Sequence, residues 1–287
     1  MTELTVVPAA EVPEPGVYEL TDDVYFGPAL ASTTLSSTGA RELLKPGGPA
    51  RYRHKADTGT VETKRAYDLG HGFHTLTLGS GPEPILFPGT GKNPEAWQTN
   101  ADKEAVAKLR AEGKVPLRPS DFAAAHAMAA AVRAHPIARV LLLAGKPEQT
   151  LIWRDPATGV LCRAKADWLR GDGIVDLKSA ESAAPDALSK AAHNHGYAIQ
   201  APFYLRGFRD RFPGVVPFFT FISVEKEPPY LVHVNQLTER ALDYGDRKVS
   251  EALQIYRDCT AAGVWPGYPL DEITDIDLPA WIRTEEF

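Results

Sequence analysis

Two aspartates and a lysine lie close together near the middle of the chain, on two segments with the residue pattern of β-strands. Asp167 lies near the end of the first segment, and Asp176 and Lys178 lie on the second, beyond a short turn that contains Gly171. Side chains alternate between the faces of a strand, so Asp176 and Lys178 share a face, and pairing around the turn would bring Asp167 beside them. Two carboxylates next to an ammonium suit a magnesium ion and a phosphodiester under attack.

A structural salt bridge is the alternative interpretation of these three residues. Charged side chains are uncommon inside an apolar strand such as Ile174–Lys178 unless they are paired or functional. This context favours a functional site over a salt bridge.

Other side chains have spacings that permit chemistry without requiring it. His71 and His74 lie three residues apart on a predicted helix, and Gln200 and Tyr204 lie four apart on another, so each pair shares a helix face. Glu148 opens a predicted strand. From spacing alone, ordinary packing or exposure to solvent remains the default for each of them, and the absence of a His-Glu-x-x-His pattern excludes the zinc proteases that carry it.

The composition is that of an ordinary globular protein. The chain has 287 residues, of which 44% are hydrophobic and 24% charged, and its net charge is −6. This charge argues against a generally basic surface that binds nucleic acid. It does not exclude a nucleic-acid enzyme, because carboxylates that bind a metal ion contribute negative charge to the metal-free sequence. Local basic clusters occur at Arg51–Lys55 and Arg206–Arg211, and each suits either phosphate or solvent.

The expected location is the cytoplasm. No apolar run is long enough for a membrane-spanning helix, and the first residues lack the pattern of a secretory signal. The two cysteines, Cys162 and Cys259, are too few for a disulfide framework or a four-cysteine metal site.

Periodicity predicts an α/β protein with a mixed central sheet flanked by helices and an N-terminal helical portion. The predicted helices cover 39–44, 62–78, 100–112, 120–134, 137–143, 185–193, 196–209 and 237–262. The predicted strands cover 148–154, 159–169, 173–178, 216–224 and 229–235. We expect an irregular arm over 1–35, a single domain over 36–264 with a helical part (36–145) and a sheet core (146–264), a long loop over 79–98, and a tail over 265–287.

Five motifs, in order, resemble the PD-(D/E)XK nuclease superfamily in its RecB/RecE branch, which includes the exonuclease VIII (RecE) nuclease domain and its phage relatives. The resemblance extends from about residue 20 to residue 262 and implies a restriction-endonuclease-like fold. The motifs are carried by an opening segment, a Gly-x-x-x-His helix, a glutamate before an aromatic strand, an Asp strand followed by Asp-x-Lys, and a Gln-x-x-x-Tyr helix. In this chain they are Asp23–Phe26 with Leu35–Leu44, Gly70–Leu76, Glu148–Trp153, Cys162–Leu169 with Asp176–Ala180, and Gly196–Tyr204.

The resemblance implies roles for individual residues. His74, Asp167 and Asp176 would bind Mg²⁺, for which Mn²⁺ would substitute, and the backbone carbonyl of Leu177 would be a further ligand. Lys178 would stabilise the pentacovalent phosphorane or lower the pKa of the attacking water.

Four further residues take their interpretation from the same resemblance. Glu148 would act in catalysis, and Gln200 and Tyr204 would contact the substrate and the surroundings of the metal, whereas His71 would be a bystander. Pro202 departs from the family pattern, because a proline inside the Gln-x-x-x-Tyr helix removes a backbone donor and affects the pose of Gln200.

The function implied is a magnesium-dependent DNA exonuclease that resects DNA ends for recombination or phage DNA processing. Its expected partners are duplex DNA ends, a single-strand annealing protein or recombinase, and further copies of the chain, arranged in a ring. Two alternatives stay open: a catalytically silent scaffold that binds DNA ends in recombination, and a metal hydrolase of small molecules.

Overall fold

The fold is built around one six-stranded mixed sheet. The computed structural model describes residues 14–58 and 65–278. The strands stand in the order β1-β4-β5-β6-β7-β8, and each neighbouring pair is antiparallel except β6–β7. Their bounds are β1 (Gly16–Glu19), β4 (Lys146–Arg154), β5 (Leu161–Leu169), β6 (Gly173–Ala180), β7 (Phe218–Glu225) and β8 (Val232–Asn235). The predicted α/β class, with a mixed central sheet flanked by helices, is confirmed.

The β4–β5 hairpin is set by its turn residues. The Asp155 carboxylate accepts hydrogen bonds from the backbone N–H of Thr158 at 2.9 Å and from the Thr158 hydroxyl at 2.7 Å. Gly159 follows with φ of +72°, which a residue without a Cβ adopts at little cost. Asp and Gly therefore close the turn and fix the register in which β4 pairs with β5.

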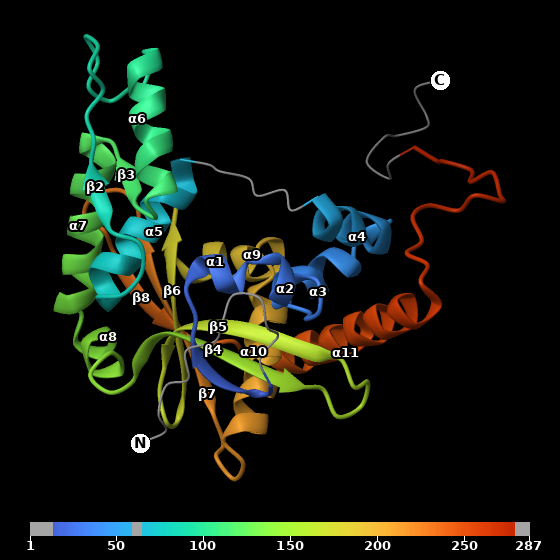
Figure 1. The fold of residues 1–287 in the computed structure, drawn as a ribbon. Coiled ribbons are helices and arrows are strands. Elements are labelled where there is room, and N and C mark those ends of the chain that lie inside the picture. Colours follow the sequence, from blue (N-terminus) through green and yellow to red (C-terminus); the bar gives the residue numbers. More distant parts are fainter. Residues whose placement is uncertain (1–13, 59–64, 279–287) are drawn as a thin grey trace, which may run out of the picture.

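Both faces of the sheet are covered by helices (Figure 1). Strands β6 and β7 are parallel and need a crossover, which α9 (Pro185–Asn194) and α10 (Tyr197–Arg211) provide. Helix α10 lies on one face and packs against α11 (Glu239–Ala262), while α5 (Arg65–Leu78) and α7 (Pro119–Ala134) lie on the other.

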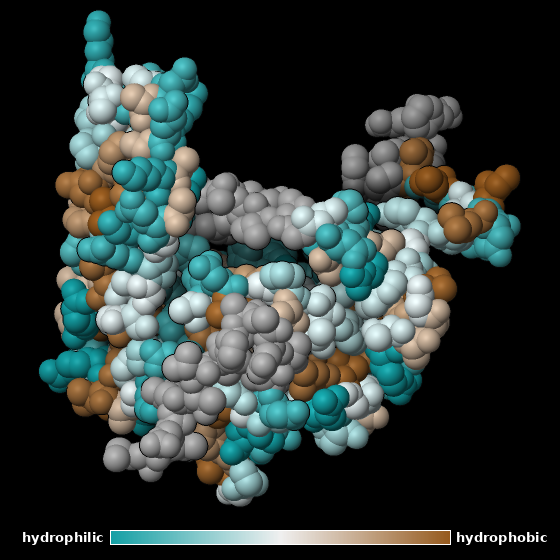
Figure 2. Space-filling view, in the orientation of Figure 1, coloured by the Kyte–Doolittle hydropathy of each residue, from teal (hydrophilic) through white to brown (hydrophobic). Residues whose placement is uncertain are grey.

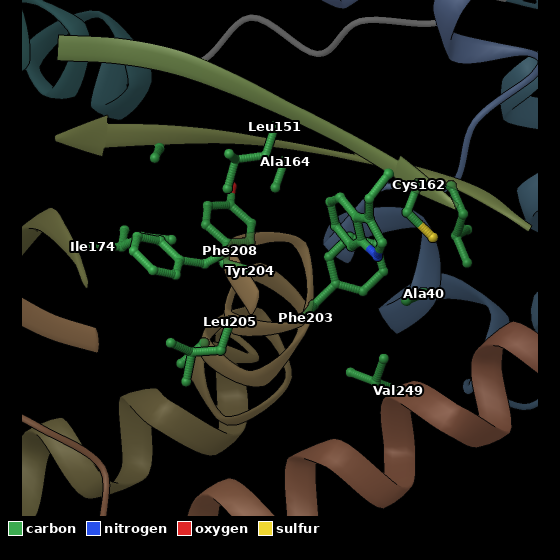
Figure 3. Close-up of a cluster of buried hydrophobic side chains, with 14 of the residues drawn as sticks. Ala40, Leu151, Cys162, Ala164, Ile174, Phe203, Tyr204, Leu205, Phe208 and Val249 are labelled. Carbon is green, nitrogen blue, oxygen red and sulfur yellow. The ribbon is translucent and has the colours of Figure 1, made fainter. Parts of the chain in front are cut away.

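Residue alternation in the strands explains why two cores form. In β5, Cys162, Ala164 and Ala166 are fully buried toward α10, whose Phe203 and Phe208 fill the space below the strands (Figure 3). In β6 the apolar residues divide: Ile174 joins the core on the α10 side, while Val175 and Leu177 are buried against α5 and α7. A strand buried on both faces has no room for a solvated charge, which makes Asp176 in the same strand notable.

The N-terminal half supplies the remaining helices and a small second sheet. The helices are α1 (Asp22–Tyr25), α2 (Pro28–Ala31), α3 (Ser37–Leu43), α4 (Gly48–Thr58), α6 (Asn100–Ala111) and α8 (Pro136–Leu141). Strands β2 (Pro84–Leu86) and β3 (Val115–Leu117) pair in parallel. Over the part of the chain that the structure describes, every helix is too short or too polar to cross a membrane.

The structure differs from the expectations at three places. Residues 1–35, expected as an irregular arm, contain β1, α1 and α2 within their described part. These elements are ordered because Tyr25 and Leu30 are buried in a small core with Ile152 of β4. The loop expected over 79–98 contains β2, which has a pairing partner distant in sequence. The Pro- and Gly-rich segment 46–49 ends one helix as predicted but also begins α4, since proline is favoured in a first turn.

Helix α10 is continuous through Pro202, and its neighbour explains how. Pro202 has no N–H to donate to the carbonyl of Ala198, four residues earlier. Gly245 of α11 lies against that carbonyl, so that a Cβ at this position would be 1.6 Å from the oxygen. The proline and the glycine together let α10 and α11 approach closely, which holds α10 against the sheet.

We expect Gly245→Ala to destabilise the protein by about 3 kcal/mol, because the added methyl group forces the two helices apart. The matched control is Gly70→Ala in α5, where the nearest atom to the added Cβ is the Ser179 hydroxyl at 4.0 Å. That change should stabilise the helix by roughly 0.5–1 kcal/mol. Chemical denaturation of both variants measures the difference, and equal stabilities would contradict this account of the helix crossing.

Candidate active site

The site begins where β5 and β6 separate. The two strands pair at Trp168–Val175 and Leu169–Ile174 and then diverge, while β6 continues beside β7 as far as Ala180. The backbone N–H of Leu177 donates to the Asp167 carboxylate at 2.7 Å, in place of a carbonyl on β5. The Asp167 side chain therefore lies in the gap between the strands and contacts the backbone between Asp176 and Lys178.

Pairing of β4 with β5 places Glu148 opposite Asp167, at a point where the backbone of β4 is distorted. Glu148 has φ of +52°, and it lies between the Pro147–Trp168 and Gln149–Ala166 pairs of the β4–β5 ladder. A non-glycine residue in this region costs on the order of 1–3 kcal/mol, and such strain is concentrated at functional sites. The distortion indicates that the position of the Glu148 side chain is worth this cost.

Helix α5 adds an imidazole to the two acids. Its Phe73 is fully buried against the sheet, which places the next residue, His74, over the ends of β4 and β5. Ligand atoms of His74, Glu148 and Asp167 all lie within 4.8 Å of one another, and His74 Nδ1 is 3.6 Å from Asp167 Oδ2. Among the described residues, these three form the one group of potential metal ligands of this kind.

Asp176 and Lys178 form a second group next to the first. The side chain of Asp176 is almost completely buried, and its Oδ2 lies 2.5 Å from Lys178 Nζ. Gln200 of α10 donates from Nε2 to the other oxygen, Oδ1, at 2.7 Å. The Lys178 ammonium also lies 4.8 Å from the centre of the Tyr197 ring, a cation–π contact that fixes it from the other side.

Burial controls the protonation of the site. It raises the pKa of Asp167 to about 7 and that of Asp176 to about 6, although Lys178 opposes both shifts. It lowers the pKa of His74 to about 4, so the imidazole is neutral at neutral pH and keeps a lone pair for a ligand. Burial also opposes the charge of Lys178, but the carboxylates of Asp176 and Asp167 hold the pKa of this ammonium above its usual range.

The residues present fit a divalent cation. One imidazole nitrogen and carboxylate oxygens are ordinary ligands for divalent first-row metals and for magnesium. Burial is the main cause of the raised pKa of Asp167, and the carboxylates of Glu148, Asp167 and Asp176 outnumber the ammonium groups of Lys165 and Lys178 beside them. A bound cation would favour the charged form of these carboxylates.

The structure groups the predicted ligands differently from the sequence. We predicted His74, Asp167 and Asp176 as ligands, whereas the compact group contains Glu148 in place of Asp176, which pairs with Lys178. For Leu177, the contact described here is made by its N–H, and its carbonyl has no described contact with the group. The roles of all these residues remain predictions.

A cavity of about 520 Å³ opens over the three potential ligands. Tyr204 lines it, and burial raises the pKa of its hydroxyl well above the usual range, so it remains protonated. His71, predicted as a bystander, is exposed and lines the same cavity.

Sequence reasoning missed Lys165, which also lines the cavity. Its Nζ lies 2.9 Å from Glu148 Oε2 and 2.5 Å from Asp22 Oδ1. Lys165 lies two residues before Asp167 on the same strand face, and this spacing is a signal that points to it. Asp22 lies in the N-terminal arm, more than a hundred residues away, and no local pattern connects it to the site.

Comparison with known proteins places the chain in a family. The family described as "PDDEXK-like domain of unknown function (DUF3799)" matches residues 49–273. A crystal structure from Eubacterium rectale, described as a "Putative exonuclease", superposes with a TM-score of 0.63 at 15% identity, over 91% of this chain and 96% of that one. No curated protein sequence matches.

The structural likeness concerns the fold, and the family match covers most of the chain. Together with the order of strands and the Asp-x-Lys on β6, they identify the architecture around the site as restriction-endonuclease-like. The chain belongs to this PDDEXK-like family, and through it to the PD-(D/E)XK nuclease superfamily.

Proposed function

We propose that this protein is a magnesium-dependent DNA exonuclease that resects DNA ends for recombination or phage DNA processing. The observation that carries the proposal is the junction of β5 and β6, where the group of His74, Glu148 and Asp167 adjoins the Asp176–Lys178 pair. Membership of the PDDEXK-like family supports nuclease chemistry. The similar crystal structure, which is described as a "Putative exonuclease", supports exonuclease rather than endonuclease activity.

In this proposal His74, Glu148 and Asp167 would hold the cation, and Asp176 lies buried next to this group. A bound Mg²⁺ or Mn²⁺ supplies positive charge that offsets the charge developing on a phosphate under attack. The site needs few protein ligands, because magnesium keeps several of its waters.

The chain's own residues supply the remaining electrostatics. Lys178 presents a fixed ammonium next to the carboxylates, oriented by Asp176 and by the Tyr197 ring. Such a preorganised cation stabilises a phosphorane more than it stabilises the resting diester. Gln200 orients Asp176 through its hydrogen bond, and Tyr204 remains a neutral hydrogen-bond donor toward the substrate side of the cavity.

The wider setting is also proposed from the RecE resemblance. Duplex DNA ends are the proposed substrate, with a single-strand annealing protein or recombinase acting on the product in the cytoplasm. A ring of several copies would retain DNA by topology, which suits a chain whose net charge is −6.

The first test is nuclease activity on end-labelled duplex DNA in Mg²⁺. Wild-type protein should release nucleotides, and Lys178→Ala should reduce the rate roughly 100- to 1,000-fold because the developing charge loses its ammonium partner. Lys146→Ala, an exposed lysine at the start of β4, is the matched control and should behave like wild type. Binding of DNA without release of nucleotides in Mg²⁺ or Mn²⁺ would refute the exonuclease and favour the scaffold.

The second test asks which acid binds the metal. Glu148→Gln should weaken Mn²⁺ binding at least about tenfold, because it removes a charged ligand from the compact group. Asp22→Asn removes the other carboxylate partner of Lys165 but contributes no atom to that group, so it should have a much smaller effect. Calorimetric titration with Mn²⁺ measures both, and equal affinities for the two variants would remove Glu148 from the ligand set.

The third test uses pH and stability in the presence of a chelator. The pKa of Asp167 rises from 3.8 to about 7 on folding, so the native state binds more protons than the unfolded state between these values. By linkage, this group makes the native state less stable as pH rises through that window. Asp167→Asn should therefore be more stable than wild type by on the order of 2 kcal/mol near pH 8.

The difference should vanish below about pH 4, where Asp167 is protonated in both states. Thermal denaturation of the two proteins across this range measures it. A variant that is less stable than wild type near pH 8 would contradict the assigned charge balance.

A further inference from the structure

We propose that α4 and the segment after α11 form a binding surface for one strand of DNA that leads into the cavity. We call this surface the α4 platform and define it by Arg51, Tyr52, Arg53, Lys55, Trp265 and Tyr268. The inference rests on the proposed nuclease function. It adds that the DNA enters the active site as a single strand.

The platform is continuous with the candidate active site. Tyr52 and Lys55 of α4 line the same 520 Å³ cavity as His74, Glu148 and Asp167. In the space-filling view a hollow lies between α4 and the α5–α7 side of the molecule (Figure 2). A strand with one phosphate at the potential ligands therefore passes α4 as it leaves the cavity.

Aromatic packing fixes the segment after α11 on α4. The Trp265 ring stacks on Tyr52 with centroids 5.5 Å apart and an angle of 26°, and it meets Tyr256 edge-on at 5.7 Å. The backbone N–H of Ala50 donates to the carbonyl of Pro266 at 3.2 Å. These contacts hold Tyr268 next to α4, although 63% of its surface is exposed.

The cations of the platform are positioned by aromatic rings. The Arg51 guanidinium lies 5.8 Å from the centre of the Tyr268 ring and donates to its hydroxyl at 2.8 Å. Within residues 14–58 and 65–278, no carboxylate lies within ion-pair distance of Arg51. An arginine that is oriented by a neutral group keeps its full charge for a phosphate.

The neighbouring charges give the platform a positive balance. Arg53 lies over the Trp265 ring at 5.9 Å and pairs with Asp57. Lys55 shares a single carboxylate, that of Glu42, with another lysine. The positive charge is therefore carried by α4, while the segment after α11, as far as Leu278, supplies aromatic rings and has its four acids beyond Tyr268.

Two observations favour a single strand over a duplex. The cavity has the size of a small-molecule site, so it receives a nucleotide of one strand rather than both strands of a helix. Exposed aromatic rings interleaved with arginines suit unpaired bases, because the rings stack on base faces that a duplex keeps covered. The proposed ligand is accordingly the reacting strand after it separates from its complement.

The test is binding of a fluorescently labelled oligothymidylate, measured by anisotropy in a chelator so that nothing is cut. Arg51→Gln should weaken binding about tenfold and reduce the slope of log affinity against log salt by about 0.7, because one phosphate contact is lost. Tyr268→Leu should weaken binding roughly tenfold, because it removes a stacking ring together with the hydroxyl that orients Arg51. Arg139→Gln, an exposed arginine on α8, is the control and should bind like wild type.

The outcomes separate this proposal from the nuclease. Wild-type affinity in both Arg51→Gln and Tyr268→Leu would overturn the platform, even if the enzyme cuts DNA. Equal losses for the oligothymidylate and for a duplex of the same length would overturn its preference for a single strand. Weakened binding in these variants, in a protein that never cuts DNA, would support the platform and remove the nuclease.

Discussion

The hydrogen bond from the Leu177 N–H to the Asp167 carboxylate is the contact on which the candidate site depends. It forms because β5 and β6 stop pairing after Val175, so a side chain takes the place of a strand partner. The same bond fixes the distance between Asp167 on one strand and the Asp176–Lys178 pair on the other. A continuous ladder would leave no space here for a cation or a phosphate.

This opening concentrates negative charge that the fold alone does not neutralise. Burial raises the pKa values of Asp167 and Asp176, and the single ammonium of Lys178 balances one carboxylate rather than all of them. Lys165 is the second cation, but it is paired with Glu148 and Asp22 at the outer edge. The cores on both faces of the sheet must offset the resulting loss of stability, as is usual where function requires strain.

The sequence predicted the sheet core well because its signals are local. The turn residues Asp155–Gly159, the alternation of apolar residues in β5 and the 3.6-residue periodicity of α11 can each be recognised in one short stretch of sequence. What it could not predict depends on contacts distant in sequence. β1 needs β4, β2 needs β3, and the Asp22–Lys165 pair joins residues 143 positions apart. Composition alone made the first 35 residues look irregular, since Pro and Thr do not reveal a pairing partner.

The different grouping of Glu148 and Asp176 follows from which strands pair beside Asp167, and no motif encodes that pairing. The register of β4 and β5 sets Glu148 directly opposite Asp167, so the two carboxylates share one face of the hairpin although Glu148 has a positive φ. Asp176, on the undistorted β6, remains buried against Gln200 and Lys178. Glu148 thus lines the cavity, whereas Asp176 is not among the residues that line it. Strand pairing therefore decides which acid joins the group: Glu148 lies on the strand that stays paired with β5 at Asp167, whereas Asp176 lies on the strand that has separated from it.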